Sequence, residues 1–121
     1  PEHYLLIRFL LKNLEVKQCT EIKVSRQFEN AVCDVYFRYK GLSYIVEACS
    51  TTVKTEEGKI SRILKSSDIE FAFVVVKDRK ILEAVQKELE DSPIKDRIIC
   101  CLLSEFLNSD IETLTSKNRE V

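Results

Sequence analysis

Residues 31–50 read AVCDVYFRYKGLSYIVEACS and predict the β-hairpin around which the rest of the fold is arranged. β-Branched and aromatic residues dominate from Val32 to Tyr39, and the stretch from Leu42 to Ser50, with Tyr44, Ile45 and Val46, again has a composition typical of strands. Lys40-Gly41 lies between the two runs and is a turn signal. With these two turn residues, Tyr39 pairs with Leu42 in an antiparallel ladder.

The same register, continued along the ladder, sets Asp34 opposite Glu47 on one face of the hairpin. Side chains that face each other in this way have Cβ atoms about 4.5–5.5 Å apart, and like charges there are destabilising. A divalent cation, a shared proton or a basic side chain would compensate for two such acids. The alternative is that Asp34 is an ordinary polar residue on a solvated strand face. We expect the paired acids to form a functional site.

An Asp in one strand followed by Glu-x-Lys in the next resembles the signature of the PD-(D/E)XK nuclease superfamily, which has the restriction-endonuclease-like fold. The matching residues in this chain are Asp34 and then Glu47-Ala48-Cys49, so a cysteine occupies the lysine position. The resemblance implies that Asp34 and Glu47 hold Mg²⁺ or Mn²⁺, with the carbonyl of Ala48 as a third ligand. It also implies that Cys49 cannot do the work of the lysine, which helps to activate water or stabilises charge on the phosphorane.

In some families of this fold the missing lysine comes from the helix that follows the hairpin. Lys54 and Lys59 are the candidates for that catalytic role here. Together with Arg62 and Lys65, they are also the residues that would bind a phosphate of a nucleic acid running past the site. The alternative for all four is a solvated helix face, as for most charge runs. His3, the single histidine, is expected to have no function.

The remaining sequence patterns predict a mixed α/β sheet. The first predicted elements are an amphipathic helix through residues 4–14, a strand from Cys19 in which Thr20, Ile22 and Val24 alternate with the residues of a wetted face, a helix capped at Thr51-Thr52 and running to about Ser66, and an interior strand at Ile69–Val76. A helix at Asp78–Ser92 follows, which has Ile81, Leu82, Val85 and Leu89 as its inner stripe and packs on that strand. The last predicted elements are a buried strand at Arg97–Leu103, one short helix through Phe106, Leu107, Ile111 and Leu114, and a frayed tail at 115–121.

This order is α-β-β-β-α-β followed by a further α-β-α. It consists of an antiparallel meander, a helical crossover to a buried strand that should run parallel to a meander strand, and an extension. The same order is the core of the restriction-endonuclease-like fold, so the resemblance covers residues 1 to about 103. We therefore expect one nuclease-like α/β domain spanning residues 1–121.

Composition sets limits on partners and location. The 121 residues are 45% hydrophobic and 32% charged with a formal net charge of −1, so any surface that attracts DNA must be local. No apolar run of about 18 residues is present, and we expect no membrane partner. The five cysteines form no Cys-x-x-Cys pair, which argues against zinc and favours reduced thiols in the cytoplasm or another intracellular compartment.

Two functions remain open from the sequence. The first is a metal-dependent nuclease that hydrolyses phosphodiester bonds in DNA, and the second is a catalytically degenerate nuclease-like module for nucleic-acid binding or protein docking. Nucleases of this fold often dimerise, although no motif here decides for a homodimer. A first residue Pro1 and the absence of Met suggest a domain of a larger protein, whose other domains would then be further partners.

Overall fold

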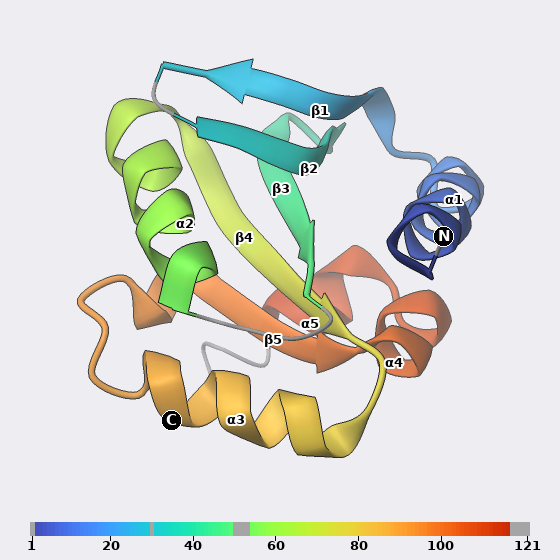
Figure 1. The fold of residues 1–121 in the computed structure, drawn as a ribbon. Coiled ribbons are helices and arrows are strands. Elements are labelled where there is room, and N and C mark those ends of the chain that lie inside the picture. Colours follow the sequence, from blue (N-terminus) through green and yellow to red (C-terminus); the bar gives the residue numbers. More distant parts are fainter. Residues whose placement is uncertain (1, 30, 50–53, 117–121) are drawn as a thin grey trace.

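The computed structural model describes residues 2–29, 31–49 and 54–116 and shows a sheet with helices on both faces (Figure 1). The elements in chain order are α1 (Glu2–Val16), β1 (Thr20–Phe28), β2 (Ala31–Tyr39), β3 (Leu42–Ala48), α2 (Lys54–Ser66), β4 (Ile69–Val76), α3 (Arg79–Leu89), a short 3₁₀ turn η1 (Lys95–Arg97), β5 (Ile98–Leu102), α4 (Leu103–Asn108) and α5 (Ile111–Ser116). The predicted α/β class and order of the elements through β5 are confirmed. None of the helices in these ranges combines the length and apolar character that a membrane crossing requires.

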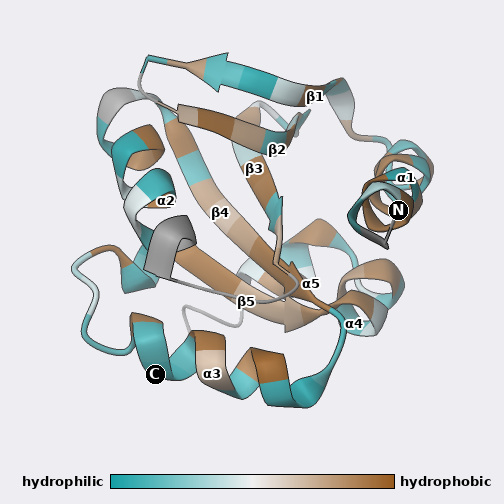
Figure 2. Cartoon of the chain, viewed as in Figure 1, coloured by the Kyte–Doolittle hydropathy of each residue, from teal (hydrophilic) through white to brown (hydrophobic). Residues whose placement is uncertain are grey.

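The sheet has five strands in the order β1-β2-β3-β4-β5. The first three form an antiparallel meander, and β4 and β5 add in parallel. Strand β4 is interior, as predicted, because its sequence IEFAFVVV presents apolar side chains to both faces. Figure 2 shows this strand as largely hydrophobic along its length, whereas the helices mix apolar and polar surfaces.

The hairpin between β2 and β3 has the predicted two-residue turn. Lys40 and Gly41 both have positive φ values, 49° and 82°, which matches a type I′ turn. Tyr39 pairs with Leu42, and the ladder then runs without a shift to the pair Val35 and Val46. Gly41 adopts its conformation at little cost, because it lacks the Cβ that disfavours the left-handed region. The turn therefore sets the register that positions the acids.

Each face of the sheet has its own core. On one face α1, α4 and α5 cover an aromatic cluster in which Phe37 stacks on Tyr44 and Phe73 meets Phe106 edge to face. On the other face α2 and α3 cover the second set of inward side chains, which includes Ile45 and Val74 on the strands, Ile60 and Ile63 on α2, and Leu82 and Val85 on α3. Glu47 lies on β3 and points to the second of these faces, where it contacts Lys59 of α2.

Strand β1 does not keep the alternation that its sequence predicts. Glu21 and Ser25 have positive φ values, and the pairing with β2 shifts between Thr20 and Lys23. Such irregularities change which side chains face inward. Val24 is consequently 49% exposed, so its predicted place on the inner side is wrong. The irregular strand lies at the edge of the sheet, where it has a partner on one side only.

Helix α3 differs from the prediction in one residue of its buried stripe. Asp78 caps the helix as expected, since its Oδ1 accepts a hydrogen bond from the Ile81 backbone N–H at 2.9 Å. The buried residues are Leu82, Val85 and Leu89, whereas Ile81 is only half-buried. The helix contacts both β4 and β5, and three of the four residues of the predicted stripe are buried there.

The last predicted helix is two helices. Residues 103–108 form α4 and residues 111–116 form α5, with Asp110 between them. Asp110 Oδ1 accepts a hydrogen bond from the Thr113 backbone N–H at 2.7 Å, so this aspartate starts a new helix where continuation was predicted. Thr115 and Ser116 belong to α5, and residues 117–121 of the predicted tail lie outside the described residues, as does the predicted cap at Thr51-Thr52.

Candidate active site

Asp34 lies where the β2–β3 ladder ends. The last backbone pair is Val35 with Val46, and one further step in the same register would place Asp34 opposite Glu47. At that point the Asp34 side chain replaces the backbone pairing between the strands, because its Oδ2 accepts a hydrogen bond from the Ala48 backbone N–H at 2.9 Å. The carboxylate is thereby anchored to the backbone of β3, directly beside Glu47.

Glu47 is the charged residue most deeply buried among those described, with no exposed surface. The residues two positions away, Ile45 on β3 and Cys49 just after its end, both pack in the core beneath α2 and α3. Alternation along the strand directs Glu47 to that same side, and its contact with α2 agrees with this. Cys49 therefore shares the face of Glu47, as the sequence predicts, but its thiol is enclosed by apolar side chains.

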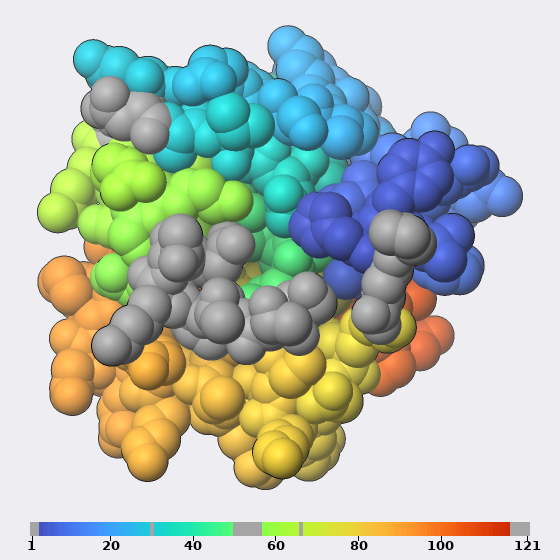
Figure 3. Space-filling model, in the orientation of Figure 1, coloured from blue at the N-terminus to red at the C-terminus, as the bar shows by residue number. Residues whose placement is uncertain are grey.

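Lys59 reaches Glu47 from helix α2. The Lys59 Nζ lies 2.8 Å from Glu47 Oε2, and the lysine side chain is only 21% exposed. The next residue, Ile60, is completely buried under the helix, which holds this turn of α2 against the sheet. In Figure 3 α1 and α2 border the same face of the molecule, with atoms of β2 and β3 between them. The hairpin and α2 thus bring two acids and one lysine together.

The other candidate basic residues of α2 are not part of this cluster. Arg62 and Lys65 are both exposed on the outer surface of the helix. The side chain of Lys54, at the first residue of α2, lies outside the described residues. Of the two lysines that the sequence offers as a replacement for the motif lysine, Lys59 is the one that the structure places at the acids.

The environment of Glu47 favours its neutral form. Burial and, after it, the negative charge of Asp34 raise the pKa of this carboxyl to about 9, against the opposing effect of Lys59. Neither Glu47 oxygen has a hydrogen bond of good geometry within the described residues, although the Lys59 ammonium group is close. A buried carboxyl of this kind requires a proton or an additional cation nearby.

These observations fit a hard divalent cation. Asp34 and Glu47 supply carboxylate oxygens, and among the described residues Glu47 Oε1 is buried without a hydrogen-bond partner while Oε2 faces the Lys59 ammonium group. Within residues 2–29, 31–49 and 54–116, no group of three or more His, Cys, Asp or Glu side chains is arranged to hold a metal. Mg²⁺ is commonly bound by only one or two carboxylates and retains several waters. The third predicted ligand, the carbonyl of Ala48, stays a prediction, because the contact seen at this residue is made by its N–H.

His3 is a site residue that sequence reasoning missed. Its Nε2 lies 3.7 Å from Asp34 Oδ1, and the imidazole is half exposed. The contact joins the first turn of α1 to the middle strand of the meander, across 31 positions of sequence. The amphipathic pattern of α1 predicts that the helix covers the sheet, but it contains no signal for where along the sheet its first turn lies.

No protein-family model, curated protein or solved structure matches this chain. Its function must therefore be inferred from the side chains of the site.

Proposed function

We propose that this protein is a metal-dependent nuclease of the PD-(D/E)XK type, which hydrolyses phosphodiester bonds in DNA. The observation that carries the proposal is the 2.8 Å contact between Lys59 Nζ and the buried Glu47 carboxylate, beside Asp34. An ammonium group held at paired acids is what phosphodiester hydrolysis needs, since negative charge develops on the phosphate during the reaction. Lys59 would supply from α2 the charge that Cys49 does not supply from β3.

Asp34 and Glu47 would hold Mg²⁺ or Mn²⁺. The bound ion would make a water more acidic and offset charge on the phosphate. Asp34 is suited to this role because the Ala48 N–H fixes the orientation of its carboxylate. Glu47 is suited because its side chain is fully buried and, within the part of the chain that the structure describes, its Oε1 has no hydrogen-bond partner.

Lys59 would donate hydrogen bonds to the attacking water or to a nonbridging phosphate oxygen. In the reaction the water oxygen forms a new bond to phosphorus, the bond from phosphorus to one sugar oxygen breaks, and a proton passes to that leaving oxygen. Arg62 and Lys65, exposed on the same helix, would contact the flanking backbone phosphates. A local basic surface of this kind is required because the whole chain carries a net charge of −1.

The test combines Mn²⁺ binding by isothermal titration calorimetry with cleavage of end-labelled DNA as single strand, duplex and junction. Asp34→Asn is the informative variant, because the amide oxygen still accepts the Ala48 N–H bond while the charge is lost. We expect wild type to bind Mn²⁺ and cleave at least one substrate, and Asp34→Asn to fold normally, lose Mn²⁺ affinity and lose cleavage. Cleavage that persists in Asp34→Asn would contradict the proposal.

The degenerate module is the second candidate, and the enclosed thiol of Cys49 at the motif lysine position is the observation that favours it. It predicts no Mn²⁺ binding and no metal-dependent cleavage with any of the three DNA substrates. That result, obtained with folded wild-type protein, would replace the nuclease assignment with a binding or docking role.

A further inference from the structure

A groove between α1 and β1 runs up to the Asp34 carboxylate. It has a volume of about 390 Å³, and the residues that line it are His3, Tyr4, Ile7, Arg8, Leu11, Val24, Ser25 and Asp34. We call it the α1–β1 groove. Asp34, a residue of the proposed nuclease site, therefore forms one end of the groove. His3, which also lines the groove, contacts Asp34.

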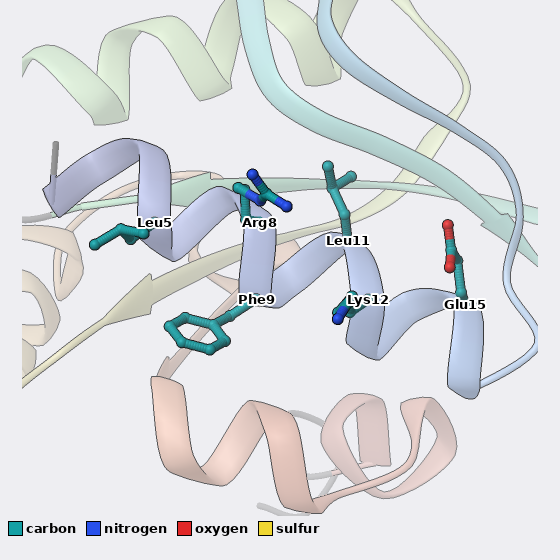
Figure 4. Close-up of a pocket in the computed structure, with 6 residues that line it drawn as sticks. All are labelled: Leu5, Arg8, Phe9, Leu11, Lys12 and Glu15. Atoms are coloured by element: carbon teal, nitrogen blue, oxygen red, sulfur yellow. The ribbon is translucent and has the colours of Figure 1, made fainter.

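The groove has an exposed aromatic ring with a cation on its face. Tyr4 is 61% exposed, and the Arg8 guanidinium carbon lies 5.8 Å from the centre of its ring. Arg8 and Leu11 project from one side of α1, whereas Phe9 projects from the other (Figure 4). An arginine beside an open ring face is the combination with which proteins stack bases and neutralise phosphates.

The floor of the groove is apolar. Ile7 and Leu11 of α1 face Val24 of β1, which the irregular pairing of that strand leaves exposed. An apolar floor suits a flat ring better than it suits an ion alone, while the exposed Arg8 favours an anionic group. The volume lies at the lower end of the range for small-ligand pockets, which suits a single nucleotide.

We propose that the α1–β1 groove binds an unpaired nucleotide of the DNA substrate, with the base against Tyr4 and a phosphate at Arg8. This inference rests on the proposed nuclease function and specifies its substrate class: single-stranded DNA, or a duplex with an unpaired strand at the cleavage point. In an intact duplex the faces of the bases are stacked on their neighbours and are not available to Tyr4. The groove would feed the adjacent nucleotide to Asp34.

The first experiment measures binding without cleavage. Fluorescence anisotropy in EDTA compares a labelled 12-nucleotide single strand with a blunt duplex of the same sequence. We expect tighter binding to the single strand, a loss of about 10-fold or more in Tyr4→Ala, and near wild-type affinity in Tyr4→Phe, since stacking on one aromatic side chain contributes about 1–3 kcal/mol per base. Phe9→Ala is the matched control, because this exposed aromatic lies on the other side of the same helix.

Arg8→Ala should also weaken single-strand binding and reduce its dependence on salt, because a phosphate contact is lost. Equal affinity for single strand and duplex, an unchanged affinity in Tyr4→Ala, or no binding at all would overturn the groove proposal. Self-association of the chain that Tyr4→Ala abolishes would overturn it too, since the groove would then be occupied by a second copy.

The second experiment separates this proposal from the proposed function. Mn²⁺-dependent cleavage is measured with the same oligonucleotides in wild type, Tyr4→Ala and Asp34→Asn. Cleavage of the duplex with no effect of Tyr4→Ala on any substrate would retain the nuclease and overturn the groove. Tyr4-dependent binding of the single strand with no cleavage in wild type would overturn the nuclease and retain the groove as a binding site. Asp34→Asn should bind the single strand at least as tightly as wild type in EDTA, because a negative charge is removed from the groove.

Discussion

The Lys59 ammonium nitrogen lies 2.8 Å from Oε2 of Glu47, a carboxylate with no exposed surface. Glu47 belongs to β3, and Lys59 belongs to α2, the helix that connects β3 to the parallel strand β4. The pair thus joins a buried carboxyl group of the hairpin to an amino group of the helix that packs over it. Its consequences for stability and for catalysis are both measurable.

Lys59→Ala should lower the rate of Mn²⁺-dependent DNA cleavage by about 10²–10³-fold, because an ammonium group at the developing charge is removed. Lys65→Ala is the matched control, since it removes the same charge from an exposed position of the same helix. Its rate should stay near that of wild type. The cleavage rates of the two variants are measured under single-turnover conditions at saturating enzyme. Equal rates in Lys59→Ala and Lys65→Ala would exclude Lys59 from the reaction.

Glu47→Gln should change how the stability of the metal-free protein depends on pH. The Glu47 carboxyl has a pKa of about 9 in the fold against an ordinary value of 4.5, so between these values the folded state holds a proton that the unfolded state releases. The contribution of this group to stability is therefore present below about pH 4.5 and is lost as pH rises toward 9. Gln stays neutral, so the variant should lose this dependence.

At pH 8 we expect Glu47→Gln to exceed wild type in free energy of unfolding by about 1 kcal/mol or more, since each unit of pKa shift corresponds to about 1.4 kcal/mol. At pH 5 the two proteins should differ much less. Urea unfolding in EDTA at a series of pH values measures the free energy of unfolding of wild type and of Glu47→Gln. A wild-type stability that rises between pH 5 and 8 relative to the variant would mean that Lys59 outweighs the burial of Glu47.

Cys49→Lys should not create activity. The Cys49 thiol is 2% exposed and packed in the core beneath α2, and Lys59 already lies at Glu47. A second ammonium group at that position would be buried without a carboxylate of its own, at a cost of roughly 3 kcal/mol or more in stability. We expect a lower melting temperature and no gain in Mn²⁺-dependent cleavage, with Cys49→Ala as the control for loss of the thiol. A clear gain in cleavage by folded Cys49→Lys would show that Lys59 does not replace the motif lysine.

Replacement of Gly41 and of Gly58 by alanine should change the stability of the protein in opposite directions. Gly41 has a φ of 82° and no atom within 4 Å of an added Cβ, so Gly41→Ala is strained only by its backbone and should cost about 1–2 kcal/mol. Gly58 lies inside α2, where an added Cβ would make only an ordinary 3.7 Å contact with Arg62 Nη1. Gly58→Ala should therefore stabilise the protein by about 0.5–1 kcal/mol. Thermal and urea unfolding measure both, and a stabilising Gly41→Ala would contradict the assigned turn.

The sequence by itself determined the features that arise from local patterns. The run at Ile69–Val76 predicts a strand buried on both faces, and Lys40-Gly41 between two β-rich segments predicts the hairpin turn and its register. The side chains of a strand alternate with a period of two, so this register also brings Asp34 and Glu47 to one end of the hairpin. Local patterns are therefore sufficient to predict the two acids of the candidate site and their proximity.

The tertiary structure decided the contacts between elements distant in sequence. Whether a lysine of α2 meets Glu47 depends on the rotation and height of the helix over the sheet, which the packing of Ile60 and Ile63 against the strands determines. The contact of His3 with Asp34 depends in the same way on the position of α1. The irregular pairing of β1 and the break at Asp110 replace regular periodicity with local hydrogen bonds and bulges. Periodicity identifies which face of an element is buried, but the neighbour of each side chain follows only from how the buried faces pack together.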